Sequence, residues 1–148
     1  MVRVDGRLER GIQTRERILD AAIAYFVAIR DYRGFDEREG WRHGVAHGAD
    51  LLMQIGFNEA YGRDAHLRIR DAVAAQIAPE GHAYIYGEGE RLARPILVIA
   101  RRGTLSEYEW SEWFAAISAP AEMPVCTILN GMLSPPRYGG LCGPARLI

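Results

Sequence analysis

The sequence predicts an all-α protein whose helices pair as antiparallel hairpins, either stacked on one another or packed as an irregular bundle. Five segments carry apolar residues at helical spacing, whereas only residues 82–87 alternate as a strand would. The links between these segments are short, and short links favour antiparallel neighbours. With 148 residues, 49% of them hydrophobic and 25% charged, the chain has the size and composition of one globular domain.

The first predicted helix spans residues 14–30. Thr14 can cap its N-terminus, and the residues that follow place an apolar group on every turn. Residues 1–13 lie ahead of this helix and are expected to form a flexible arm. The apolar positions are Ile18, Ala21, Ala22, Tyr25, Phe26 and Ile29.

Two further helices are predicted in the middle of the chain. The acids of residues 36–39 suit the positive end of a helix, so the second helix is expected to begin there and to end at Ile55. The third helix begins at Asn58 or Arg63 and ends at Ile77, just before a turn that contains proline.

The last two predicted helices follow a linker. Residues 82–87 are expected to be that linker, because six residues without a pairing partner make a poor strand. The fourth helix spans residues 88–101, and Pro95 either kinks it or marks a later start. The fifth helix follows the capping box Thr104-Leu105-Ser106-Glu107, and its inward residues are Trp110, Trp113, Phe114 and Ile117.

Beyond residue 118 the sequence pattern changes. Pro and Gly interrupt every apolar run of residues 119–148, which predicts a poorly ordered tail with at most one short helix, at residues 126–132. The predicted organisation is therefore a flexible arm, a single helical domain over residues 14–118, and this tail.

A narrow polar stripe on the second helix is the candidate functional site. On a helical wheel that starts at Trp41, nearly the whole circumference is apolar or small, and the remaining polar residues lie within about 60° of one another. Such a helix is expected to be mostly buried, and its polar stripe then needs partners inside the fold. The stripe consists of His43, His47, Asp50 and Gln54.

The spacing of this stripe is that of a metal site. His43 and His47, one turn apart, can share a zinc-like divalent ion, and Asp50 can add a carboxylate oxygen. Glu88 or Glu90, at the head of the fourth helix, is the expected further ligand or general base. The alternative is a purely structural network in which the same residues bond one another without a metal.

The remaining histidines and the tryptophans are expected to be structural. His66 lies among Arg and Asp residues and should be exposed, and His82 lies in the linker. Trp41, Trp110 and Trp113 are expected to anchor the core.

Three blocks of the sequence form a recognisable pattern. They are Asp31-Tyr32-Arg33-Gly34-Phe35, Gly40-Trp41-Arg42-His43-Gly44-Val45-Ala46-His47-Gly48-Ala49-Asp50, and Gly87-Glu88-Gly89-Glu90-Arg91-Leu92-Ala93. The pattern resembles an uncharacterised bacterial family, domain of unknown function 2785, over residues 18–113. The resemblance implies an all-helical, HEAT-like fold and no known activity. Gly89 stands where the family usually has an acid, and the Pro/Gly-rich end also departs from the family pattern.

The sequence leaves three functions open. The first is a helical scaffold that binds a protein or peptide, and the second is a metal-dependent hydrolase built on the polar stripe. The third is DNA binding, since residues 14–22 resemble the opening helix of TetR-type repressors, although no recognition helix follows.

Composition argues against several partners. The formal net charge is −1, so no basic field favours nucleic acid or an anionic membrane. The longest apolar stretches are too short to span a bilayer, and the first residues lack the apolar run of a signal peptide. Two cysteines, Cys126 and Cys142, cannot form a disulfide framework, so we expect a cytoplasmic protein.

Overall fold

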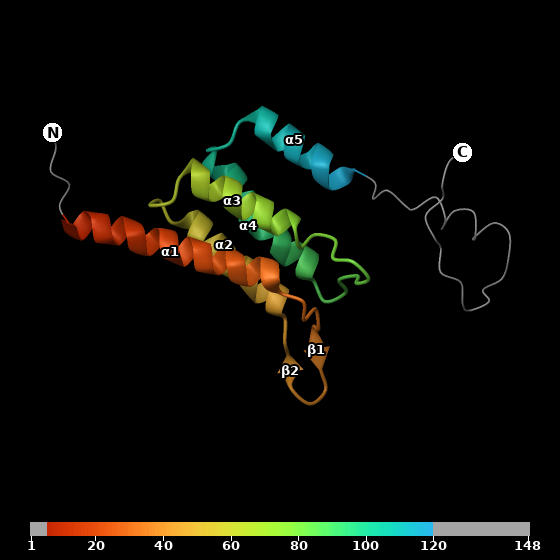
Figure 1. Ribbon diagram of the computed structural model, residues 1–148. Coiled ribbons are helices and arrows are strands. Elements are labelled where there is room, and N and C mark those ends of the chain that lie inside the picture. The colour runs from red at the N-terminus through yellow and green to blue at the C-terminus, as the bar shows by residue number, and fades with distance from the viewer. Residues whose placement is uncertain (1–5, 120–148) are drawn as a thin grey trace, which may run out of the picture.

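The chain forms five helices and one small sheet within residues 6–119, the part that the computed structural model describes (Figure 1). The predicted all-α class is confirmed, with a short hairpin of strands as an addition. The helices are α1 (Gly6–Ala28), α2 (Gly44–Phe57), α3 (Arg63–Ala74), α4 (Glu88–Arg102) and α5 (Glu107–Ser118). The strands are β1 (Phe35–Asp36) and β2 (Gly40–Trp41), between α1 and α2.

The first four helices form two antiparallel pairs, α1 with α2 and α3 with α4, and the second pair lies beside the first (Figure 1). α1 and α3 run in the same direction, because Arg68 contacts Asp20 in the middle of α1 while Gln76 contacts its end. The amide of Gln76 is buried and donates to the carbonyl oxygen of Phe26 at 2.9 Å. It thereby satisfies an acceptor that the end of a helix leaves free.

α2 and α4 also run in the same direction and make the most extensive contact between helices of the described chain. Asp50 in the middle of α2 pairs with Arg91 near the start of α4. Arg102, at the end of α4, donates to the carbonyl oxygen of Phe57 at 3.1 Å, at the end of α2. The second pair therefore caps the C-terminal end of both helices in the first pair.

The core lies where these four helices meet, and a glycine sets how closely α1 and α2 approach. A Cβ atom at Gly48 would lie 2.5 Å from Cδ2 of Phe26, so only glycine fits at this crossing. The largest aliphatic and aromatic side chains with no solvent exposure are Leu19, Phe26, Leu52, Ile69 and Ile99.

The hairpin of β1 and β2 replaces the predicted first turn of the second helix. The carboxylate of Asp36 accepts hydrogen bonds from the backbone N–H of Arg38 at 2.9 Å and of Glu39 at 3.0 Å, which closes a turn. Gly40 has a φ of 73°, and strand pairing places Phe35 opposite Trp41. The prediction that a helix begins at residues 36–39 is therefore wrong, because the Asp36 side chain bonds a turn instead of a helix end.

α1 begins earlier than the sequence predicted. Its first residue is Gly6, so residues 6–13 are helical and do not belong to a flexible arm. Thr14 lies inside the helix, where its hydroxyl donates to the carbonyl oxygen of Arg10 at 2.8 Å. The prediction of an N-cap at Thr14 is wrong, because a threonine hydroxyl can also bond the preceding turn of its own helix.

The linker and the starts of the two helices next to it agree with the sequence, but α3 ends at Ala74 and not at the predicted Ile77. α3 begins at Arg63, one of the two predicted positions, and residues 82–87 are neither helix nor strand. α4 begins at Glu88 as predicted and continues through Pro95 without a break in the helix.

The capping box of α5 lies two residues later than predicted. The N–H of Ser106 donates to Glu109 Oε2 at 2.8 Å, and the N–H of Glu109 donates to Ser106 Oγ at 3.3 Å. Thr104 instead bonds His66. Phe114, predicted to point inward, is 52% exposed.

Some predictions concern residues that the structure does not describe. Residues 120–148 of the predicted tail, with the short helix at 126–132, lie outside the described range, and so do residues 1–5. Of the helices within residues 6–119, none has both the length and the hydropathy that a membrane span requires.

Candidate functional site

The candidate site lies where α2 and α4 both begin, next to the hairpin. Nε2 of His43 lies 3.7 Å from Oε1 of Glu88, and the Glu88 side chain is almost fully buried. This distance is too long for a hydrogen bond, and within the described residues the buried Nε2 atom has no hydrogen-bond partner. His43 therefore lies near Glu88 without bonding it, whereas the predicted convergence of His43, His47 and Asp50 on one acid of the fourth helix is not present.

The backbone holds His43 in an uncommon conformation. This residue is the N-cap of α2 and has a φ of 38° and a ψ of 40°, in the left-handed region, with no hydrogen bond from its side chain to the helix end. A non-glycine residue in this region costs about 1 kcal/mol or more. The cost is offset by ring contacts, since the imidazole centroid lies 4.5 Å from that of Trp41 and 6.3 Å from that of Tyr86.

Glu88 fixes the linker that precedes α4. Its Oε2 atom accepts a hydrogen bond from the backbone N–H of Tyr86 at 2.9 Å. The Tyr86 ring in turn lies directly over Gly34, where any Cβ atom would collide with it. A buried carboxylate and a glycine thus hold the Tyr86 ring in one place.

Trp41 and Tyr86 lie against His43, and Phe35 lies against Trp41; we call these three side chains, Phe35, Trp41 and Tyr86, the aromatic surface. Their exposed fractions are 49%, 59% and 43%. The Trp41 ring contacts Phe35 with centroids 5.3 Å apart and Tyr86 with centroids 5.8 Å apart, both edge to face. Trp41, predicted to anchor the core, lies instead on the surface, because β2 places it outside the helix.

A cavity of about 320 Å³ lies at the base of the hairpin beside the start of α2. Arg42 and Asp31 give it a mixed charge, and the guanidinium of Arg33 holds the pKa of Asp31 far below its usual range by hydrogen bonding. Since neighbouring strand residues point to opposite sides, Arg42 faces away from the Trp41 ring. The lining residues are Tyr25, Ile29, Arg30, Asp31, Arg42 and Gly44.

The other predicted site residues do not join His43 and Glu88. His47 is exposed on α2, and Gln54 is exposed two turns further along. Asp50 pairs with Arg91 and lies 3.7 Å from Arg94, so a cation of α4 takes the place expected for a metal ion. Glu90 is exposed and bonds Arg94 at 3.0 Å.

Within residues 6–119, no three His, Cys, Asp or Glu side chains gather as a metal ligand set would. α2 is mostly buried, as expected, because α1, α3 and α4 all contact it. Its exposed residues are His47, Leu51, Gln54 and Phe57, so two members of the polar stripe lie in solvent.

The expectation that His66 is exposed is also wrong. It is fully buried, and its two ring nitrogens lie 2.6 Å from the hydroxyl of Thr104 and 3.3 Å from the carbonyl oxygen of Gly56. Burial lowers the pKa of His66 below its ordinary value of 6.5. The predicted exposure is wrong because the apolar face of α3 includes this position. His82 lies in the linker as expected, where its ring stacks on Tyr32 at 5.1 Å.

Sequence reasoning missed two groups at the site. Tyr86 belongs to the segment Tyr84-Ile85-Tyr86, in which aromatic residues alternate. This pattern could have indicated that its rings pack against a nearby strand. Arg91 and Arg94 stand one turn apart on α4, and this spacing could have identified them as the partners of Asp50.

Comparisons with known proteins give one match. A family model described as "Protein of unknown function (DUF2785)" matches residues 7–127, which include every residue of the site. No curated protein and no solved structure matches the chain.

Proposed function

Because the chain belongs to the family of unknown function DUF2785, whose name supplies no activity, we propose a function from the site alone: a helical scaffold that binds a protein or peptide partner on the aromatic surface. The observation that carries the proposal is the exposure of Phe35, Trp41 and Tyr86 on a rigid support. Tryptophan and tyrosine are enriched among the residues that dominate the energy of protein interfaces.

The exposure of these rings, and the contacts that hold them in place, favour a role in binding over a role in folding. Each of the three residues leaves 43% or more of its surface in water, so a partner that covers them gains the apolar area that they now expose. The Glu88 carboxylate and the hairpin hold the rings in place before any partner arrives, which reduces the entropy that binding costs.

The surroundings define the chemistry of the partner. The aromatic surface offers an apolar centre, and the exposed ion pair of Arg33 with Asp31 offers polar groups beside the hairpin. An apolar centre with a polar rim is typical of interfaces between proteins. The expected partner therefore presents an apolar side chain flanked by polar or charged groups.

Photo-crosslinking tests this proposal in the native host. A benzoylphenylalanine placed at Trp41 should form a crosslinked product of defined mass, and the same group placed at Tyr108 should not. Tyr108 is a matched control, because it is an aromatic residue of α5 with 72% exposure and lies outside the site. The same products from both positions, or none from position 41, would contradict the proposal.

The metal-dependent hydrolase is less favoured, because Asp50 pairs with Arg91 and no three His, Cys, Asp or Glu side chains of residues 6–119 form a possible ligand set. We expect the purified chain to carry less than one equivalent of zinc, in an amount that His43→Ala and His47→Ala leave unchanged. Elemental analysis of the three proteins checks this. One equivalent of zinc that either substitution removes would restore the metal hypothesis.

A further inference from the structure

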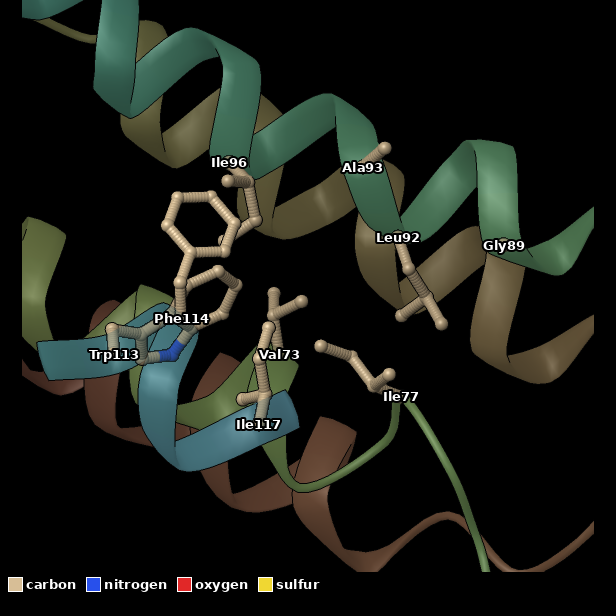
Figure 2. Close-up of a pocket in the computed structure, with 9 residues that line it drawn as sticks. All are labelled: Val73, Ile77, Gly89, Leu92, Ala93, Ile96, Trp113, Phe114 and Ile117. Atoms are coloured by element: carbon tan, nitrogen blue, oxygen red, sulfur yellow. The ribbon is translucent and has the colours of Figure 1, made fainter. Parts of the chain in front are cut away.

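Two cavities of the described chain differ in the chemistry of their walls. The groove in Figure 2, between α3, α4 and α5, has a volume of about 260 Å³, and none of the nine residues drawn there is charged. The cavity at the base of the hairpin, which we call the hairpin cavity, measures about 320 Å³, and its wall includes Arg30, Asp31 and Arg42. The groove accepts any apolar group of suitable size, whereas the charges of the hairpin cavity select its ligand.

Arg30 brings to the hairpin cavity a guanidinium group that no acid of residues 6–119 neutralises. Its Nη1 atom donates to the carbonyl oxygens of Val27 and Ile29, both at 2.7 Å, at the end of α1. These two bonds hold the guanidinium at the wall, and they leave its Nε and Nη2 atoms without a partner in the described chain.

The carboxylate of Asp31 does not cancel this charge, because Arg33 already neutralises it. Arg33 Nε donates to Oδ1 of Asp31 at 2.8 Å, and Arg33 Nη2 donates to Oδ2 at 2.6 Å. Arg42 pairs with Glu39, and its buried Nε atom has no hydrogen-bond partner among the described residues. Three arginines against two acids leave one positive charge at the hairpin cavity.

The start of α2 adds to this positive field. Gly44, the first residue of α2, belongs to the wall of the hairpin cavity, and no side chain caps the helix there. The N–H groups in the first turn of a helix have no acceptor within the helix, and they favour a negative charge nearby. The helix end therefore acts in the same sense as the two arginines of the wall.

We propose that the hairpin cavity binds a small organic molecule that carries an oxyanion, either a carboxylate or a phosphate group. Arginine can hold either group through two parallel N–H bonds, and Ile29 and the ring of Tyr25 offer apolar contacts to the rest of the molecule. The volume of the cavity lies at the lower end of the range of about 300–1,000 Å³ for ligand sites. Since Arg42 faces away from the Trp41 ring, this site is separate from the aromatic surface and does not rest on the function proposed above.

Titration of the full chain with benzoate and with phenyl phosphate, at constant ionic strength, tests the inference. We expect a saturable shift of the Gly44 amide signal in NMR spectra, and the probe with the lower Kd identifies the favoured oxyanion. Benzamide has the shape of benzoate without its charge, so it is the matched ligand control and should leave the Gly44 signal in place. The same shift with benzamide, or no saturable shift with either anion, would overturn the inference.

Two substitutions test whether the arginines of the wall hold the anion. Arg30→Gln and Arg42→Gln each remove one positive charge from the hairpin cavity and should raise the Kd of the tighter probe 10-fold or more. Arg38→Gln, at an exposed position in the turn of the same hairpin and outside the wall, is the matched control and should leave that Kd unchanged. Because Arg30 also bonds the end of α1, the amide spectrum of each variant serves to show that it is folded. An unchanged Kd in both cavity variants, or an equal rise in Arg38→Gln, would contradict the inference.

Discussion

At the residue scale, buried polar groups connect the helices of this protein. His66 joins α3 to the end of α2 and to the start of the α5 segment, through Gly56 and Thr104. Gln76 joins α3 to the end of α1, and Glu88 joins α4 to its own linker. The partners of these three side chains are backbone or hydroxyl groups that helix ends and loops leave without a hydrogen bond. Removing any one of the side chains therefore leaves a buried polar group unsatisfied.

The buried imidazole makes stability depend on pH. Burial lowers the pKa of His66 below 6.5, so in acid the unfolded state takes up a proton that the folded state does not. The free energy of unfolding should be insensitive to His66 above 6.5, fall as the pH drops below that value, and level off below the folded-state pKa. Urea unfolding at about pH 7.5 and about pH 5 measures the loss. His66→Asn should reduce it, whereas the exposed His47→Asn should not; an unchanged loss in His66→Asn would contradict the assignment.

A glycine at the crossing of α1 and α2 gives a second test. Gly48→Ala forces a Cβ atom against Phe26, so it should lower the free energy of unfolding by about 1–3 kcal/mol. Gly89→Ala, inside α4, is the matched control, because a Cβ atom there meets nothing within 4 Å. Chemical denaturation of both variants checks the difference. A Gly48→Ala protein as stable as the wild type would mean that the two helices do not cross at this point.

At the element scale, the sequence predicts a helix well where apolar residues recur strongly at helical spacing. It predicts the ends of the helices less well. α4 begins where the sequence placed it and α3 begins at the later of the two predicted positions, because Glu88 and Arg63 follow clear turn signals. The start of α2 was misplaced because the acids of residues 36–39 suit either a helix end or a turn. The outcome depends on Asp36 bonding the N–H groups of Arg38 and Glu39, which periodicity does not reveal.

The start of α5 allows the cap itself to be tested. Ser106→Ala removes the acceptor for the N–H of Glu109 and should lower the free energy of unfolding by about 0.5–2 kcal/mol. Ser111→Ala, at an exposed position inside the same helix, should have little effect or stabilise the protein slightly. Urea denaturation of the two variants compares them. An equal effect at both positions would contradict the assignment of Ser106 as the N-cap.

At the scale of the whole molecule, stacking decides which residues form the site. The sequence placed His43 near an acid at the head of the fourth helix, and Glu88 lies 3.7 Å from it, but the hydrogen bond that a buried polar group is expected to make is not formed. The sequence could not show that α4 lies parallel to α2, and this alignment brings Arg91 to Asp50 and leaves His47 in solvent. The same alignment sets Tyr86 beside Trp41 and so creates the aromatic surface.

The affinity of the crosslinked partner for substituted chains tests the proposed function most directly. Trp41→Ala should raise Kd by about 10-fold or more, since a central aromatic residue of an interface contributes about 2 kcal/mol or more. Tyr108→Ala, which removes an exposed aromatic side chain of α5, should leave Kd unchanged. Far-UV circular dichroism of both variants confirms that the helices are intact. Equal Kd values for Trp41→Ala and the wild-type chain would contradict the proposal that this protein binds its partner through the aromatic surface.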